Sequence, residues 1–580
     1  MRKFLLTAVV FALGFLGIQA QQMQQIASSA PILNMAYPAG GKAGSTFEVT
    51  VTGQNFDAVE GLHFSFPGAT AEVLNAEMAP VDKNPQKRPK GMQAGPRAAY
   101  KFKVTVPEKT PLGIHDVRVV TKAGVSNPRA FVVGDLPETA EKEPNDDVPT
   151  AQRIPLDSVV HGVIGTPTDV DYYQFAGKKG QRVVVSCLTS SIDSRLPAAI
   201  QLYSMAGKFL GFNRNYQNND ALIDATLPED GDYFVRVFGF THTIGGPDYF
   251  YRLSVSTAPW IDAVVPSAVE AGKETKVTVF GRNLPGGVID PALKLDGVAL
   301  EKVVVTVKPP VNPKAKLDYS GMVLPMSSSL DGFELRLRNA AGASNPFLIA
   351  YARAPVIVEA APSNVTEAAN VVPLPVQVAG RIEKRGEIDW YRFAGKKGQP
   401  LAIELFGDRL GSPADFKFTL KAARTTLTTQ DDNLETMSPQ FYSRTDDPPR
   451  YRFTPGEDAD YFVGVSSADN GFGPRHVYSL RIAPEDGDFQ VVAMPVSNVS
   501  PDCAVTGPEG NYAYTLFVWR LGNFTSDITV SATKLPPGVT MKPQIVSATQ
   551  KQAAAVLSVA TGAPAYSGPI VLEAQAEING

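Results

Sequence analysis

Hydrophobic and polar residues alternate with a period of two along most of this chain. Tyr233, Val235 and Val237 fall on one face of a predicted strand, and Leu253 and Val255 fall on one face of another. This period is typical of strands with one face on a core and the other towards water. Turn signals such as PAGG, LPGG and PEDG separate these segments, and amphipathic helical patterns are scarce. The pattern therefore predicts an all-β fold made of β-sandwiches.

A thirteen-residue segment occurs twice, as DVDYYQFAGKKGQ at 169–181 and as EIDWYRFAGKKGQ at 387–399. The repeat extends beyond this segment, because PAGGKAGSTFEVTVTGQNF at 38–56 is similar to PSAVEAGKETKVTVFGRNL at 266–284. A repeat of about 220 residues indicates tandem domains rather than a solenoid.

We therefore expect a tandem array of about five β-sandwich domains. The predicted parts are a signal peptide at 1–20, unit A at 31–134, unit B at 137–257, unit A′ at 258–353, unit B′ at 355–484 and a terminal unit at 487–580. The sequence ends directly after a strand-like segment, which leaves a truncated terminal unit open as an alternative.

The repeated segment itself reads as a core strand followed by a turn. Tyr173 and Phe175 are expected to face the core, and Asp171 stands at the strand entrance. AGKKGQ is expected to form a hairpin in which Gly180 adopts positive φ and the lysines lie in water, so that the strand at 182–188 returns beside the first. A structural role as a core strand and turn is thus enough to explain most of the similarity between the two copies of the segment.

The ends and the overall composition narrow the class of protein. Arg2 and Lys3 precede an apolar run that ends at Ala20, which predicts a secretory signal peptide. No later stretch approaches the ~18–20 apolar residues of a spanning helix, so we expect a secreted, periplasmic or cell-surface protein without membrane insertion. Cys187 and Cys503 are the only cysteines, so disulfides do not hold the units together, and Cys187 alternates in phase with core valines.

Charge and catalytic motifs argue against two further classes. The formal net charge of −4, mixed along the chain, gives no case for nucleic-acid binding. None of the five histidines stands in H-E-x-x-H, and the chain has neither a G-x-S-x-G elbow nor an S-x-x-K motif. The sequence therefore predicts a protein without catalytic activity.

Unit B resembles the bacterial pre-peptidase C-terminal (PPC) domain family. The resemblance rests on EKEPNDD at 141–147, the segment at 169–181, GDYFVRV at 231–237 and YRLSVS at 251–256. It implies a jelly-roll-like sandwich of the kind appended to secreted peptidases, to which the collagen-binding modules of bacterial collagenases are similar. Unit B′ is a degenerate second copy. Units A and A′ resemble immunoglobulin-like IPT/TIG domains, the terminal unit resembles another immunoglobulin-like sandwich, and the whole array resembles large exported proteins of planctomycete-like bacteria.

Six oxygen-bearing side chains flank the entry of unit B and the start of the repeated segment. They are Glu141, Glu143, Asn145, Asp146, Asp169 and Asp171. Such a set suits Ca²⁺, which takes 6–8 oxygen ligands in irregular geometry. In the collagen-binding relatives the corresponding acids are calcium ligands, so the resemblance implies the same role here. The alternative is a solvated acidic linker.

The second copy serves as an internal comparison for this hypothesis. At the offset of the repeat, the six positions hold Glu359, Ala361, Ser363, Asn364, Glu387 and Asp389. This set carries fewer charges, so calcium, if it binds, is expected in unit B and not in unit B′.

Three functions remain open from the sequence. The first is a non-catalytic exported protein that attaches to an extracellular protein or polysaccharide polymer or to a cell surface, with calcium stiffening the junction between units A and B. The second is the ancillary region of a secreted peptidase or other hydrolase whose catalytic domain lies outside this chain. The third is a structural cell-surface stalk, and a sandwich fold by itself does not decide among them.

Overall fold

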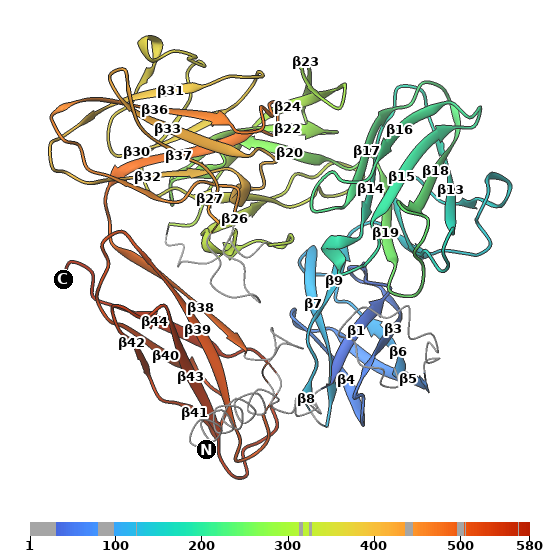
Figure 1. Ribbon diagram of the computed structural model, residues 1–580. Helices are drawn as coiled ribbons and strands as arrows, with labels where there is room; N and C mark the ends of the chain where they lie inside the picture. The colour runs from blue at the N-terminus through green and yellow to red at the C-terminus, as the bar shows by residue number, and fades with distance from the viewer. Residues whose placement is uncertain are drawn as a thin grey trace, which may run out of the picture.

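The computed structural model describes residues 31–78, 98–122, 124–311, 317–323, 327–434, 445–495, 504, 506–566 and 568–580. The predicted signal peptide and Cys503 lie outside these residues. Within them the chain is built from strands β1 to β44, and the helical elements are 3₁₀ turns of three residues (Figure 1). The predicted all-β array of sandwiches is confirmed. No helix in the described part is long and apolar enough to cross a membrane.

Unit B is a sandwich of two five-stranded sheets. The first has the order β10 (Glu138–Ala140), β12 (Ser158–Val163), β19 (Phe250–Ser256), β14 (Arg182–Leu188) and β17 (Ala221–Thr226). The second has the order β11 (Gln152–Arg153), β13 (Val170–Gly177), β18 (Gly231–Gly239), β15 (Ala198–Ser204) and β16 (Phe209–Asn213).

The repeated segment contributes to the core of unit B as predicted, but its turn is of a different kind. Tyr173 and Phe175 are fully buried, and Gly180 has φ of 80°. The expected hairpin is wrong, because β13 pairs with β18 while β14 belongs to the opposite sheet. AGKKGQ therefore carries the chain from one sheet to the other. A period of two fixes which face of a strand is apolar, and it leaves the choice of neighbouring strand open.

Unit B′ repeats this topology strand for strand. Its first sheet has the order β28 (Val356–Val358), β30 (Val376–Arg381), β37 (Val477–Pro484), β32 (Leu401–Phe406) and β35 (Tyr451–Phe453). Its second sheet has the order β29 (Asn370–Val371), β31 (Asp389–Gly395), β36 (Ala459–Ser467), β33 (Phe416–Ala422) and β34 (Thr425–Gln430). Tyr391 is fully buried, as Tyr173 is in unit B, so the two copies share one scaffold.

Units A and A′ share most of their strands but differ at one edge. The first sheet of unit A has the order β1 (Ile32–Tyr37), β3 (Thr46–Gln54), β6 (Ala98–Thr105) and β5 (Thr70–Met78). The second has the order β2 (Gly40–Lys42), β9 (Arg129–Gly134), β7 (Gly113–Thr121) and β4 (Val59–Phe64), with β8 (Gly124–Val125) paired to β7. The first sheet of unit A′ has the order β20 (Trp260–Val265), β22 (Thr275–Arg282), β24 (Val298–Val307) and β23 (Val288–Leu295). The second has the order β21 (Ala268–Val269), β27 (Phe347–Tyr351), β26 (Gly332–Leu335) and β25 (Leu317–Asp318). The edges differ because β4 of unit A is antiparallel to β7 whereas β25 of unit A′ is parallel to β26.

A repeated asparagine explains one motif that these two units share. In GVSNP, Asn127 accepts a hydrogen bond from the Leu33 amide and donates to the Leu33 carbonyl, both at 2.9 Å. In GASNP, Asn345 makes the same two bonds with Ile261, at 2.7 and 2.9 Å. The amide side chain thus ties the last part of each unit to its first strand.

The terminal unit has a four-stranded and a three-stranded sheet. The first consists of β38 (Asp488–Pro495), β39 (Asn511–Leu521), β43 (Gln552–Val559) and β41 (Val539–Met541), and the second of β42 (Gln544–Val546), β40 (Ile528–Lys534) and β44 (Val571–Gln575).

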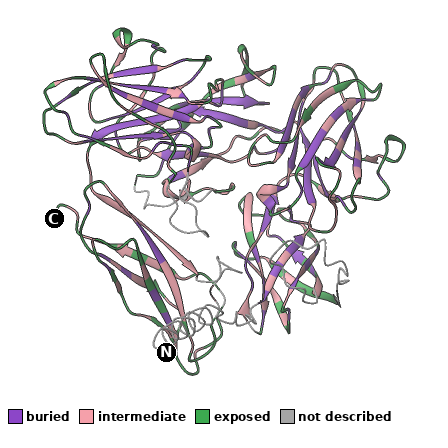
Figure 2. Cartoon of the chain, in the orientation of Figure 1, coloured by how far each residue is buried: buried purple, intermediate pink, exposed green. Residues whose placement is uncertain are grey.

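Neighbouring units bury side chains that a solitary sandwich would leave in water. On β19, Phe250 and Arg252 point away from the core of unit B, yet they are only 4% and 8% exposed. Figure 2 shows buried residues along the strands of unit B. The expectation that this face lies in water is wrong. Unit A′ lies between units B and B′ (Figure 1), and its Arg282, 2% exposed, donates through Nε to Asp224 of unit B at 2.8 Å.

Candidate metal centre

The acidic segment at the entry of unit B folds back along the repeated strand. β10 runs parallel to β12, and the Glu141 amide donates to the His161 carbonyl at 2.9 Å. The chain then turns, and the Tyr172 amide of β13 donates to the Asn145 carbonyl at 2.9 Å. These backbone bonds bring the segment against the start of β13, as a shared site requires.

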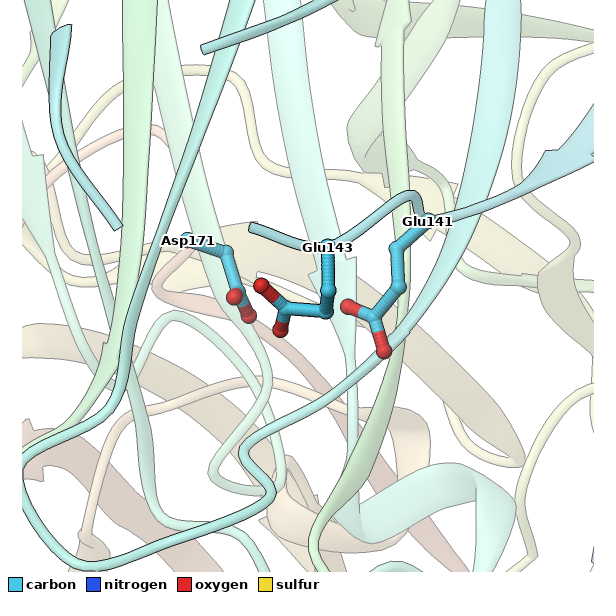
Figure 3. A group of neighbouring side chains, drawn as sticks. All are labelled: Glu141, Glu143 and Asp171. Atoms are coloured by element: carbon cyan, nitrogen blue, oxygen red, sulfur yellow. The ribbon is translucent and has the colours of Figure 1, made fainter. Parts of the chain in front are cut away.

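Five carboxylates meet there in two overlapping groups. Ligand oxygens of Glu141, Glu143 and Asp171 all lie within 4.8 Å of one another, and Figure 3 shows the three carboxylates gathered side by side. Ligand oxygens of Glu143, Asp146 and Asp169 satisfy the same condition. Glu143 belongs to both groups, so it connects the buried Asp171 to the exposed Asp146.

Asn145 completes the set from the buried side. Its side chain is fully buried, and in one amide orientation its nitrogen donates to Asp171 Oδ1 at 3.2 Å and to Glu143 Oε2 at 2.9 Å. In the opposite orientation its oxygen faces the same two carboxylates, which is repulsive unless a cation lies between them. The Asn145 side chain could therefore be a ligand through its oxygen when a cation is bound, and a hydrogen-bond donor through its nitrogen when no metal is bound.

Burial and mutual repulsion hold protons on this cluster. Burial, followed by the charge of Glu141, raises the pKa of Asp171 to about 9. Burial raises the pKa of Glu141 to about 8, with the charges of Glu143 and Asp169 adding to the effect and a hydrogen bond from the Val163 amide opposing it. A divalent cation would replace these protons as the compensating charge.

A buried tyrosine pair fixes the inner end of the cluster. Tyr251 Oη donates to Asp171 Oδ2 at 2.5 Å and lies 2.6 Å from Tyr173 Oη. Val163 donates from its amide to Glu141 Oε1 at 2.8 Å. Tyr37 of unit A donates to the His161 carbonyl at 3.0 Å, so unit A is anchored on the strand beside the cluster. The sequence analysis missed Tyr251 and Tyr37, although the recurrence of a tyrosine at 251 and 478 was a signal for the first.

The donor set fits calcium better than softer metals. The groups that converge are carboxylate and amide oxygens, the hard ligands that Ca²⁺ takes in irregular arrangements. All six residues of the sequence hypothesis lie in this one region, with Asp171 and Asn145 buried and Glu143 and Asp146 exposed. These residues could hold an ion that enters from the exposed side.

Unit B′ keeps the tyrosine pair but changes the acids. Tyr478 Oη donates to Asp389 Oδ2 at 2.8 Å and lies 2.6 Å from Tyr391 Oη. Burial raises the pKa of Asp389 to about 9 and that of Glu359 to about 7. At this position the described part of unit B′ has no three acidic ligand atoms within 4.8 Å of one another. A proton shared by Glu359 and Asp389 would offset the repulsion between these two carboxylates.

Another acidic group in unit B′ was not predicted. Ligand oxygens of Asp415, Asp431 and Asp432 lie within 4.8 Å of one another, and burial raises the pKa of Asp415 to about 6. Asp431 and Asp432 are exposed, so water solvates most of this charge.

The buried residues with reactive side chains have structural partners. His161 lies 2.5 Å from Glu138, and Glu138 accepts from Arg252 at 2.6 Å, all three being buried at the junction of units A and B. Cys187 is fully buried and burial raises its pKa, which disfavours the nucleophilic thiolate.

Comparison with known proteins supports part of the resemblance. Residues 169–239 match the family described as Bacterial pre-peptidase C-terminal domain. A stretch of 151 residues is 30% identical to a probable subtilase-type serine protease of Deinococcus radiodurans, covering 25% of this chain and 20% of that protein. The chain thus spans about a fifth of the length of this curated relative.

Two solved structures also show similarity. The pre-peptidase C-terminal domain of a collagenase from Bacillus anthracis is 18% identical with a TM-score of 0.16, covering 20% of this chain and 99% of that one. The secreted serine protease VesC from Vibrio cholerae is 11% identical with a TM-score of 0.15, covering 37% and 48%. The family match and the sequence relative fit a non-catalytic ancillary region of an extracellular protein.

Proposed function

We propose that this chain is a non-catalytic exported protein that attaches to an extracellular polymer through unit B, with Ca²⁺ fixing the junction between units A and B. The main support is a difference between the two copies. Units B and B′ share one topology, and within the residues that the structure describes unit B has a five-carboxylate cluster and an aromatic outer face that unit B′ lacks.

The aromatic face is the outer side of the sheet that contains β13, β18, β15 and β16. Strand register places Tyr172, Arg236, Gln201 and Phe212 in one row, and Gln174, Phe234, Tyr203 and Phe209 in the next. Phe209 and Phe212 are 54% and 45% exposed, and Phe240 is 43% exposed beside them. Large aromatic side chains that remain in water on a flat sheet are typical of binding surfaces.

Arginines add polar contact capacity to this face. The Arg214 guanidinium lies 3.9 Å from the centre of the Phe240 ring, and the Arg236 guanidinium lies 4.5 Å from that of Phe238. Each ring is thereby held in place while the guanidinium retains donors for a ligand. An open sheet surface of this kind suits an extended chain better than a small molecule.

The corresponding rows of unit B′ keep one aromatic residue each but are polar at the edge strand β34. They contain Trp390, Gly464, Thr419 and Thr429 in one row, and Arg392, Phe462, Lys421 and Thr426 in the next. The exposed phenylalanines of β16 are thus replaced by threonines on β34. The scaffold does not require aromatic residues at these positions, which supports a binding role for them in unit B.

Calcium would act on the geometry of this surface. The candidate ligands join the segment that leaves unit A to β13, a core strand of unit B. An ion held there would order the segment and fix the angle between the two units. The aromatic face would then stand in a constant orientation to the rest of the array.

The test is a pull-down of the full chain with insoluble collagen, bacterial cell wall and insoluble polysaccharides, in the presence of calcium. Phe209→Ser together with Phe212→Ser should reduce retention on the bound polymer at least tenfold. Thr426→Ala together with Thr429→Ala, the matched changes in unit B′, should leave retention unchanged. Equal retention of both double variants, or no retention of the unaltered chain on any polymer, would refute the attachment role.

A second function is favoured by the comparisons. The family match and the similarity to a probable subtilase-type serine protease suit the ancillary region of a secreted peptidase. Sequencing the natural reading frame beyond residue 580 separates the two: a peptidase domain in the same frame supports the ancillary role. Attachment by unit B is compatible with that role, whereas an inert stalk would bind no polymer.

A further inference from the structure

Units A, B and A′ together line a partly open cavity of about 240 Å³ that none of the roles above uses. Its floor is the outer face of the first sheet of unit B, the face that unexpectedly lies buried. Its walls come from β7 and β9 of unit A and from β20 and residues 319–322 of unit A′.

Small polar residues in the floor leave the space open. Ser254 of β19 and Ser186 of β14 are direct neighbours across the two strands, with Val159 on one side and Leu222 on the other. All four line the cavity. Larger side chains at the two serines would fill it, so the choice of serine creates the space.

The walls are apolar and aromatic, and hydrogen bonds between units hold them. Ile114 and Val132 face the cavity from unit A, and Tyr216, Trp260 and Tyr319 supply aromatic rings. The Ile114 amide donates to the Ser320 carbonyl of unit A′ at 2.8 Å, and Arg336 of unit A′ donates to the Leu112 carbonyl of unit A at 3.0 Å. The cavity is therefore a shaped site rather than a loose gap between domains.

Three of the four charged groups in the lining have ion-pair partners, and the fourth, Asp220, is held by hydrogen bonds from Thr189 and Ser191. Arg252 is paired with Glu138 at 2.6 Å, and Asp135 with Arg338 at 2.8 Å. Arg336 is paired with Glu334, and Asp220 accepts from the Thr189 amide at 2.7 Å. A charged ligand would lose its hydration without gaining a free counter-charge, so the cavity favours a neutral ligand.

The lining also requires polar groups on the ligand. Ser186 and Ser254 place hydroxyl groups on the floor of the cavity. A ligand hydroxyl can hydrogen-bond to these groups, which a hydrocarbon cannot do. The volume lies below the ~300–1,000 Å³ of pockets that hold drug-sized ligands, so a single ring fits better than a chain.

We propose that this cavity binds one neutral sugar residue, with its hydroxyls towards Ser186, Ser254 and Arg252 and its apolar face against the aromatic wall. The site is separate from the aromatic outer face and does not depend on polymer attachment there. A sugar bound at the meeting point of three units would also favour their closed arrangement.

The test is isothermal titration of the full chain with glucose, galactose, mannose, xylose and N-acetylglucosamine, each added alone. At least one sugar should give saturable heat and a change in tryptophan emission, because Trp260 lines the cavity. Trp260→Phe should lose the change in emission, which assigns that signal to the cavity. Ser254→Leu, which fills the space, should weaken the affinity at least tenfold, and Ser186→Val should do the same if the leucine variant does not fold.

Two results would overturn the proposal. One is the absence of saturable heat with all five sugars. The other is unchanged affinity in a folded, cavity-filled variant. Phe209→Ser with Phe212→Ser should bind the sugar normally, so failure of polymer attachment and failure of this site are distinguishable.

Discussion

Calcium should stabilise unit B of the intact chain, and the effect should depend on Asp171. The perturbation is the addition of Ca²⁺ to chain stripped with a chelator, at pH 7.5. The ion replaces the protons that burial keeps on Asp171 and Glu141, whose pKa values in the metal-free protein are about 9 and about 8. Binding should therefore release between one and two protons per chain at this pH.

The size of the effect follows from these two groups. At 1.36 kcal/mol per pKa unit, ionising Asp171 at pH 7.5 costs about 2 kcal/mol and ionising Glu141 costs somewhat under 1 kcal/mol. The apparent dissociation constant should thus be about a hundredfold weaker at pH 7.5 than well above pH 9. A calcium concentration a hundred times that constant still adds about 2.7 kcal/mol to the free energy of unfolding. For a unit of this size that corresponds to roughly 10 °C in melting temperature.

Calorimetry measures both quantities. Scanning calorimetry in chelator and in calcium should show one transition that moves upward, and titrations in buffers of different ionisation enthalpy count the released protons. Asp171→Asn should abolish the shift, whereas Asp389→Asn, the matched change in unit B′, should leave it intact. The reasoning would be refuted by an equal shift in both variants, or by binding without proton release.

Two further predictions concern buried charge. Folding raises the pKa of Glu359 to about 7 and that of Asp389 to about 9. Their contribution to the stability of unit B′ is therefore fully present below about pH 4 and is lost as the pH rises through those two values. Urea unfolding of the metal-free chain at pH 5 and at pH 8 should show the decrease. Arg282→Met removes the arginine paired with Asp262 and one of the two arginines paired with Asp224, and should lower the free energy of unfolding by about 3–5 kcal/mol. Arg153→Met, at a largely exposed pair, should lower it much less.

Each of these two predictions can be contradicted by its own measurement. A free energy of unfolding for unit B′ that rises between pH 5 and pH 8 would show that Glu359 and Asp389 are ionised in the folded state. Equal losses from Arg282→Met and Arg153→Met would show that the junction between units B and A′ is not held by the buried arginine.

The sequence predicted the faces of strands well and their neighbours less well. Tyr173 and Phe175 lie in the core as the period of two indicated, because burial of alternate residues is a local property. The pairing of β13 with β18 was missed, since that partner lies about sixty residues further along and no local pattern encodes it. Burial of Arg252 was missed for a related reason: it depends on units A and A′, which a reading of β19 alone does not contain.

In the candidate site, too, the local clusters were predictable from the sequence and the long-range contacts were not. The acidic residues were recognisable because they cluster in two short segments and because a family resemblance gave them a role. Tyr251, which donates to Asp171 from a position 80 residues away, could not be assigned to the site without the fold. The aromatic face was also hidden, because Phe209 and Phe212 become neighbours of Tyr203 and Gln201 only through strand register.

The central claim is that unit B holds calcium and its copy does not. Anomalous diffraction from crystals of the full chain soaked in calcium chloride tests this most directly. The account predicts a peak in unit B at about 2.3–2.6 Å from oxygens of Glu143 and Asp171, with no peak beside Glu359 and Asp389. A peak at both places, or none between Glu143 and Asp171, would contradict it.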